Sequence, residues 1–432
     1  MPGDPSWTRI VTPNNLVFNR FPAGVARCAN PNDVGQSILW AREHTVPFVA
    51  RCGGHNYAGY STTPGLMIDL GALDRVDFDP RTRVATVGGG VLNSALYATL
   101  RKLDVTITHG RCPTVGVAGF FLGGGIGFNM RAHGLACDQL AGTEIVTADG
   151  RVRTVDPRSG LFWACQGGAG GNFGINTSFS VKTFPVPSPF SVFSLSWTER
   201  PREVYGALME SLSKGPAGLG TRLQISAGDP PSVQLLGQLT GTPEQVRAIL
   251  EGPYKVAKPA AEQIRAMAYW PAQISFLSEL GSPEFYQERS RFFKGALTDA
   301  AMNTAFDWAR RWPGTTQGAR MVLFQTGQQV NALGPGDTAF VHRDSDWLMT
   351  INLAWGSDTS DELVKQNRGW LDGFYGAMIE FATPGSYQNF PDPSLTNYLE
   401  SYYLTNLPRL RTVKTEVDPT RVFTYPQAIP PA

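Results

Sequence analysis

The chain contains, directly after an expected β-strand, the stretch RCGGHNYAGYS at residues 51–61. Its adjacent glycines, Gly53 and Gly54, can turn successive backbone N–H groups toward one point, which is how backbone nests bind phosphate groups. His55 follows them on the same loop. The stretch also fits a plain glycine turn that carries a surface histidine. Taken alone, it indicates an anion-binding loop and leaves the role of His55 open.

A second glycine-rich stretch, GRCPTVGVAG at residues 110–119, is followed by GGGIG at residues 123–127. Cys112 lies near the start of the first of these glycine-rich segments, where a cysteine contributes little to packing. Arg111 and the nearby N–H groups would favour the thiolate form, so Cys112 is a candidate nucleophile. The alternative is a buried, unreactive cysteine. Both stretches predict a close approach of backbone to a ligand.

Other common site motifs are a poor match. Cys52 and His55 could begin a zinc site, but no second Cys/His pair follows at a suitable spacing, and we expect no metal. No G-x-G-x-x-G opens an amphipathic helix in a βαβ unit, and the P-loop pattern G-x-x-x-x-G-K-[ST] is absent. His109 and His133 are expected to be hydrogen-bonded structural histidines.

Bulk composition limits the classes of function. At 432 residues the chain is long enough for two joined domains. Its 37 Lys+Arg and 36 Asp+Glu leave almost no net charge, so neither nucleic acid nor a membrane is an expected partner. The sequence shows neither a leader nor a membrane span, and its five cysteines do not form a disulfide pattern. We expect a soluble monomer or homodimer that is cytoplasmic, or secreted if a leader has been removed.

Hydrophobic patterning suggests two structural parts. Residues 21–70 indicate strand, helix, strand and strand, with Asn32 or Asp33 as the helix N-cap. Residues 144–156 indicate a hairpin that turns at Asp149-Gly150. From about residue 190, β-like stretches alternate with helical ones, which suits an antiparallel sheet covered on one face by helices. The predicted fold class is α+β.

Four motifs in the right order make the chain resemble a known family, the berberine-bridge-enzyme-like branch of the FAD-linked oxidases with the vanillyl-alcohol-oxidase fold. Residues 51–55 are similar to its RSGGH loop, with Cys52 in place of serine. Residues 110–119 are similar to G-x-C-P-x-V-G-V-G-G, and LFWACQGGAGGNFGI at 161–175 is similar to DLFWA-x-RGGGGG-x-FGI. The stretch at 402–430 resembles the family's carboxyl-terminal YYG-x-N…QSI segment. The likeness covers nearly the whole chain.

The resemblance implies a division into two domains. A PCMH-type FAD-binding domain would span residues 1–187 and be completed by the carboxyl-terminal segment 388–432. Residues 188–387 would form the substrate-binding domain.

The resemblance also implies a doubly attached flavin. His55 would bond the 8α-methyl carbon of the ring system, and Cys112 would bond ring carbon C6. Electron-withdrawing links of this kind raise the flavin potential and leave room for an open site. The residues expected to cradle the pyrophosphate are Arg51, Gly53, Gly54, Asn56 and Gly59. Those expected along the rest of the cofactor are Val115, Gly116, Gly119, Gly124, Gly127 and Ile175.

The candidate catalytic residues lie in YQNFPD at 387–392, which matches the family's Y-x-N-[YF]-x-D stretch. Tyr387 would be the general base, with a pKa lowered by its neighbours, and Asn389 would orient substrate or hold the flavin. The stretch also fits a loop that packs the domain interface. Ile126 stands where many relatives have a tyrosine, so no second catalytic tyrosine is expected. Val115, a small residue three positions after the cysteine, favours an oxidase.

The expected activity is oxidation of a CH–OH group in a sugar, a secondary alcohol or a natural-product intermediate. Tyr387 would take a proton as hydride moves from carbon to flavin N5, and dioxygen would reoxidise the flavin to give hydrogen peroxide. The partners would be a small-molecule substrate and O2. A dehydrogenase or oxidative cyclase of the same fold, and more distantly a non-catalytic binding protein, also fit the sequence.

Overall fold

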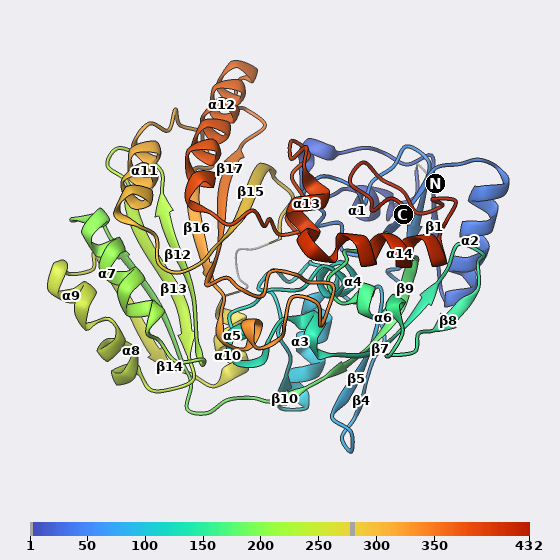
Figure 1. Ribbon diagram of the computed structural model, residues 1–432, viewed down its shortest axis with the longest axis horizontal. Helices are drawn as coiled ribbons and strands as arrows, with labels where there is room; N and C mark the ends of the chain where they lie inside the picture. The colour runs from blue at the N-terminus through green and yellow to red at the C-terminus, as the bar shows by residue number, and fades with distance from the viewer. Residues whose placement is uncertain (1–2, 277–280) are drawn as a thin grey trace.

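The computed structural model describes residues 3–276 and 281–432, and its first half contains two larger sheets and one two-stranded sheet (Figure 1). A three-stranded parallel sheet has the order β1-β3-β2, with β1 Gly24–Arg27, β2 Phe48–Arg51 and β3 Leu66–Asp69. An antiparallel sheet has the order β4-β5-β9-β7-β8. Its strands are β4 Val76–Asp79, β5 Val84–Gly88, β7 Leu140–Val146, β8 Val152–Thr154 and β9 Ile175–Lys182.

Two local predictions needed correction in this half. Helix α2 spans Pro31–Glu43, and its N-cap is Asn30 rather than Asn32 or Asp33, because Pro31 fits the first helical position and the Asn30 side chain accepts the Asp33 N–H. The β7–β8 hairpin is confirmed, with Val146 opposite Val152. Its connection is the longer loop 147–151 rather than a two-residue turn.

The second part is built on one seven-stranded antiparallel sheet, ordered β14-β11-β13-β12-β16-β17-β15. Its strands are β11 Ser191–Trp197, β12 Leu219–Ser226, β13 Ser232–Leu239, β14 Ala261–Ala266, β15 Phe285–Phe293, β16 Ala319–Gln325 and β17 Trp347–Trp355. Helices cover one face of it, as predicted (Figure 1). They are α7 Pro201–Ser213, α8 Pro243–Ile249, α9 Glu251–Val256, α11 Asp299–Arg310 and α12 Asp361–Met378.

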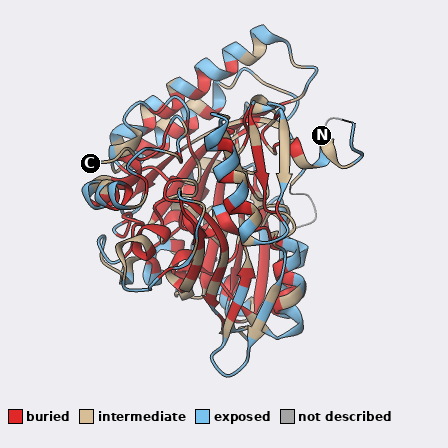
Figure 2. Cartoon of the chain, turned by 90° about the vertical axis from the view of Figure 1, so that its right-hand side faces the viewer, coloured by how far each residue is buried: buried red, intermediate tan, exposed pale blue. Residues whose placement is uncertain are grey.

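Alternation along the strands separates the two faces of this sheet. Odd-numbered side chains such as Leu223, Leu235 and Met349 form the buried core beneath the helices. Even-numbered side chains point the other way, because successive residues of a strand face opposite sides. Figure 2 shows the strands as mostly buried and the outer surfaces of the helices as exposed. The even face is therefore the one available to line a site.

The carboxyl-terminal segment returns to the first half of the molecule (Figure 1). This segment contains helices α13 Tyr398–Tyr403 and α14 Leu407–Val417. Helix α14 packs against α6 Gly160–Cys165. The buried Lys414 ammonium lies 2.6 Å from Asp418 and donates to the carbonyls of Asn172 and Phe423. These contacts tie the segment to residues 161–175. They suit the predicted completion of the first domain by residues 388–432, whose boundaries stay predictions.

Shorter elements connect these parts. The helices are α1 Trp7–Val11, α3 Asn93–Lys102, α4 Val117–Leu122, α5 Met130–His133 and α10 Tyr269–Ser275, and β6 Val105–Thr106 pairs with β10 Phe184–Pro185. The 3-10 turns are Leu16–Phe18, Ala136–Gln139, Gln328–Ala332, Ile379–Phe381 and Leu404–Asn406. No helix in the described part of the chain is both long and apolar enough to cross a bilayer.

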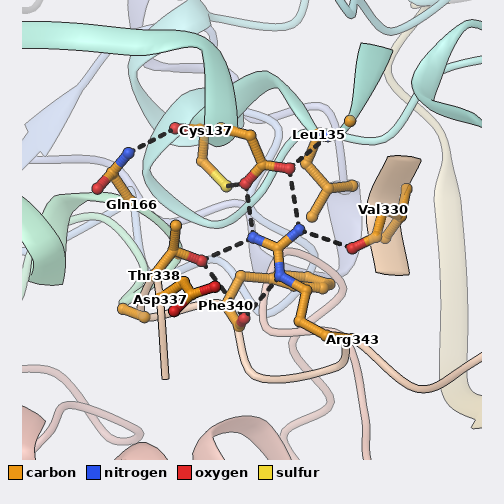
Figure 3. A network of polar contacts seen from close by, with 12 residues as sticks. Leu135, Cys137, Gln166, Val330, Asp337, Thr338, Phe340 and Arg343 are labelled. Carbon is orange, nitrogen blue, oxygen red and sulfur yellow. Dashed lines mark hydrogen bonds and ion pairs between the residues drawn. The ribbon is translucent and has the colours of Figure 1, made fainter. Parts of the chain in front are cut away.

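A buried ion pair joins the two halves (Figure 3). Arg343 donates to both carboxylate oxygens of Asp138, at 2.5 and 2.9 Å, and its other N–H groups reach Thr338 and the carbonyls of Val330 and Phe340. All the donors of the guanidinium are thereby satisfied, which a buried arginine requires. The pair holds the segment that follows GGGIG against the loop between β16 and β17.

Removing Asp138 from the buried pair should leave the charge of Arg343 without a counterion. We expect Asp138→Ala to lower the free energy of unfolding by about 3–5 kcal/mol, measured by urea denaturation. Asp77→Ala removes an exposed pair with Arg75 and should cost less than about 1 kcal/mol. Equal losses in the two variants would contradict this account of the joint.

Candidate active site

The two glycine-rich loops, the first loop at residues 51–61 and the second loop at residues 110–119, pack against each other at a contact that excludes side chains. A Cβ added to Gly53 would collide with the backbone of Gly116 and Thr114. A Cβ added to Gly116 would collide with Cys52 and with the backbone of Gly53. A tightly packed interior leaves little room for backbone to move aside. Glycine at both positions therefore sets the spacing of the loops.

Thr114 stands between the two residues predicted to attach the cofactor. Its hydroxyl oxygen lies 2.8 Å from His55 Nε2 and 3.5 Å from Cys112 Sγ. Burial, with a smaller contribution from the Arg51 charge, lowers the pKa of His55 to about 4. The imidazole is thus neutral at pH 7 and keeps a nucleophilic nitrogen. Sequence reasoning missed Thr114, because it is one variable position inside a motif defined by glycines and a cysteine.

A cavity of about 630 Å³ opens between these loops, the carboxyl-terminal segment and the even face of the seven-stranded sheet. Both predicted attachment residues and both predicted catalytic residues lie in its wall. The other predicted site residues in the wall are Gly53, Gly54, Asn56, Val115, Gly116, Gly119, Gly127 and Ile175. A Cβ on Gly119 would meet no atom of the described residues within 4 Å, so this glycine faces the cavity.

Three residues expected to touch the cofactor lie behind the wall instead. Arg51 donates to the carbonyls of Thr12 at 2.6 Å and Ser61 at 3.3 Å, so its side chain ties the first loop to the amino-terminal segment. Gly59 has a φ of 71° and packs on Phe18. Gly124, with a φ of 125°, lets Phe340 and Tyr387 approach. Each supports the wall rather than lining it, a distinction that a sequence motif does not carry.

The structure changes the expectation for the pKa of Tyr387. Its phenolic oxygen accepts the Gly125 N–H at 2.9 Å and the Asn389 Nδ2–H at 3.3 Å. These donors favour the phenolate, but burial outweighs them and raises the pKa above its usual value. The prediction of a lowered pKa is therefore wrong. Asn389 also donates to the Phe120 carbonyl at 3.2 Å, which fixes its side chain beside Tyr387.

The sheet contributes cavity residues that the motifs did not reveal. From β12 and β16 come Arg222, Gln224 and Arg320, and from β15 and β17 come Glu288 and Asn352. All are even-numbered, and the signal for them was the polar half of the strand alternation. Three aromatic rings close the same region: Tyr57 stacks on Phe390 with ring centroids 4.8 Å apart and meets Tyr286 edge-on.

The remaining histidines and cysteines have structural surroundings. His109 is hydrogen-bonded to Tyr269 and the Gly110 carbonyl, and His133 stacks on Phe184. All five cysteines are free thiols. Within residues 3–276 and 281–432 there is no group of three or more His, Cys, Asp or Glu side chains suited to a metal ion.

Comparison with known proteins agrees with this geometry. Residues 22–156 match the FAD binding domain family, and residues 386–430 match the berberine and berberine-like family. An uncharacterized FAD-linked oxidoreductase of Bacillus subtilis, YgaK, is 31% identical over 99% of this chain and 95% of its own length.

Two fungal oxidases share the fold as well. The carbohydrate oxidase of Microdochium nivale is 29% identical over 100% of this chain and 92% of its length, and its crystal structure matches with a TM-score of 0.89 at 26% identity, covering 100% of this chain and 97% of that one. Glucooligosaccharide oxidase from Acremonium strictum, which carries 6-S-cysteinyl, 8α-N1-histidyl FAD, matches with a TM-score of 0.89 at 24% identity and covers 100% and 97% of the two chains.

The fold, the two glycine-rich loops and the family matches together identify the chain as a flavin-binding oxidoreductase with a vanillyl-alcohol-oxidase-type fold. The chain belongs to the berberine-bridge-enzyme-like family of FAD-linked oxidoreductases. Its residues suit the cofactor, because glycine backbone, a neutral imidazole and a thiol meet at one cavity wall.

The glycine contact between the loops should be needed for flavin binding. In Gly53→Ala the new methyl group meets backbone atoms, so we expect a loss of about 1–3 kcal/mol of stability and purified protein with several-fold less flavin absorbance per chain. Gly369, exposed in α12, has nothing within 4 Å of an added Cβ. Gly369→Ala should keep full flavin content and gain about 0.5–1 kcal/mol. A Gly53→Ala protein with normal flavin content would show that flavin binding does not need the contact between the loops.

Proposed function

We propose that this chain is an FAD-linked oxidase that oxidises a hydroxyl-bearing carbon of a small molecule, with the flavin attached through both His55 and Cys112. The observation that carries this proposal is the position of these two side chains on either side of Thr114 in one cavity wall. The carbohydrate oxidases among the relatives support an alcohol or sugar hydroxyl as the group that reacts. The partners would be that substrate and dioxygen.

Bound FAD would accept a hydride from the substrate carbon and pass the electrons to dioxygen, giving hydrogen peroxide. The protein supplies the geometry for the accompanying proton transfer. Tyr387 projects into the cavity, and its oxygen accepts two hydrogen bonds that stabilise the phenolate once it forms. Asn389 holds this oxygen in place. Tyr387 is therefore the residue we propose to take the substrate proton.

Val115 supports the oxidase over a dehydrogenase. It is a small side chain in the cavity wall close to Cys112, at the position that the family resemblance links to oxygen access. The test is stoichiometric oxygen uptake and peroxide formation during oxidation of a panel of sugars and secondary alcohols. Bleaching of the flavin by a substrate without oxygen uptake would replace the oxidase with a dehydrogenase or cyclase.

Removing the Tyr387 hydroxyl should slow the reaction without disturbing the fold. We expect Tyr387→Phe to lower kcat by about 10²–10⁴-fold. Because burial raises the pKa of Tyr387, its basic form appears only as the pH increases, so wild-type kcat/KM should climb through the alkaline range and this climb should vanish in the variant. Tyr205 is a buried tyrosine outside the cavity wall, and its hydroxyl has no hydrogen-bond partner among residues 3–276 and 281–432, so Tyr205→Phe serves as the control. A variant Tyr387→Phe with a wild-type pH profile would exclude this role.

The lowered pKa of His55 predicts how its attachment responds to acid. In Cys112→Ala apoprotein mixed with FAD, the rate of histidyl attachment should stay constant from pH 8 to about pH 5 and decline with a midpoint near pH 4. The reason is that the neutral imidazole is the nucleophile and persists until the pH falls through the lowered pKa. Acid-stable flavin on the denatured protein measures the rate. A midpoint near the ordinary histidine value of about 6.5 would contradict the buried, neutral state.

A further inference from the structure

Three arginines face the same cavity from opposite walls. Arg222 on β12 and Arg320 on β16 lie on the even face of the sheet, and Arg111 precedes Cys112 in the second loop. In the strand register Arg222 is opposite Phe324 and Arg320 is opposite Ser226. The two sheet arginines therefore flank Gln224 and Val322, so one patch of the wall has a guanidinium on each side.

These partly buried arginines lack, among the described residues, the partners that fully buried arginines of this protein have. Arg343 has Asp138 and three further acceptors, and Arg131 donates to the carbonyls of Thr326 and Gly215. Among the described residues, no side-chain hydrogen bond or ion pair involves Arg111, Arg222 or Arg320. Arg111 packs its guanidinium 4.9 Å from the centre of the Phe128 ring. In the described part of the chain these guanidinium donors therefore have no side-chain or ion-pair partner, and all three arginines line the cavity.

The grouping is electrostatically unfavourable in the free protein. Burial lowers the pKa of Arg222 to about 9 and that of Arg111 to about 10, and the neighbouring arginines add to both shifts. Buried charges of one sign normally have a counterion, because desolvation and mutual repulsion oppose them. Glu288 and Glu284, which line the same cavity, act on Arg222 and Arg320 electrostatically but form no ion pair with them among the described residues. A further anion bound in the cavity is the simplest explanation for three arginines in one place.

Two carboxylates share the cavity wall and limit the charge of that anion. Glu288 accepts the Asn352 Nδ2–H at 3.1 Å, and Glu284 lies at the exposed rim. Burial raises the pKa of both. With both ionised, the three arginines leave a single net positive charge, which a carboxylate matches and a phosphate dianion exceeds. Arginine also binds a carboxylate through two parallel hydrogen bonds.

We propose that the substrate carries a carboxylate as well as the hydroxyl group that is oxidised, and that Arg111, Arg222 and Arg320 bind this carboxylate. The substrate class is then a hydroxy acid, such as a sugar acid or an acidic natural product, rather than a neutral oligosaccharide. The inference rests on the proposed function, because it takes this side of the cavity as the substrate side.

Binding and oxidation are tested separately with sugars that differ only at C6. Calorimetric titration of D-glucuronate and D-glucose, and of D-galacturonate and D-galactose, into Tyr387→Phe holoenzyme measures affinity with turnover slowed. At least one acid should bind about 10- to 100-fold more tightly than its neutral partner. Arg222→Gln and Arg320→Gln should each remove most of that difference, and Arg320→Lys should restore part of it. Arg265→Gln, an exposed arginine on β14, should change nothing.

Flavin bleaching in the wild-type holoenzyme gives the second readout. Acids that bind through the arginines but never bleach the flavin would leave the anion site standing and refute the proposed oxidation. Neutral sugars that bind and bleach the flavin as well as the acids would leave the oxidation standing and overturn the anion site. Failure of both acids to bind, or a preference that persists in the arginine variants, would also overturn it.

Discussion

The close contact between Gly53 and Gly116 is the constraint on which the rest of the site depends. It allows two loops from distant parts of the chain to approach at backbone distance, and it brings His55 and Cys112 to either side of one threonine hydroxyl. A side chain at either glycine would separate the loops. The buried Arg343–Asp138 pair has a complementary role, because it joins the segment behind the second loop to the sheet half of the molecule. Together these two contacts position the two loops and the sheet around the cavity.

The division of the seven-stranded sheet explains how one sheet can be both a core and a binding surface. Its buried apolar core residues are odd-numbered and pack beneath the helices. Its even-numbered residues carry arginine, glutamate, glutamine and asparagine into the cavity. Because the two sets are independent, the charge of the cavity can change without disturbing the core. Family membership therefore leaves the substrate undetermined. The three arginines of the cavity are the residues from which we infer the substrate of this protein.

Much of the fold could be predicted from the sequence, since strand alternation, helix periodicity and the order of four motifs are all local signals. The motifs also picked out His55 and Cys112, which the structure brings to either side of Thr114, and their attachment to a flavin stays a prediction. Three kinds of feature did not follow from these signals. Arg51, Gly59 and Gly124 belong to the glycine-rich motifs but lie behind the wall, because a sequence motif does not say which way a residue faces. Thr114, Arg222 and Arg320 gain their importance only from neighbours distant in sequence. The pKa of Tyr387 depends on burial, which no local pattern reports, so its predicted direction was wrong.

The central claim is that one FAD is held by two covalent bonds, and mass spectrometry of the denatured protein tests it most directly. The account predicts an intact mass greater than that of the polypeptide by one FAD, with a single flavin that cross-links the peptides containing His55 and Cys112 after digestion. Exchange to Ala at either residue should leave one bond and retain the added mass. A denatured protein with the mass of the bare polypeptide, or flavin bound to neither peptide, would contradict the account.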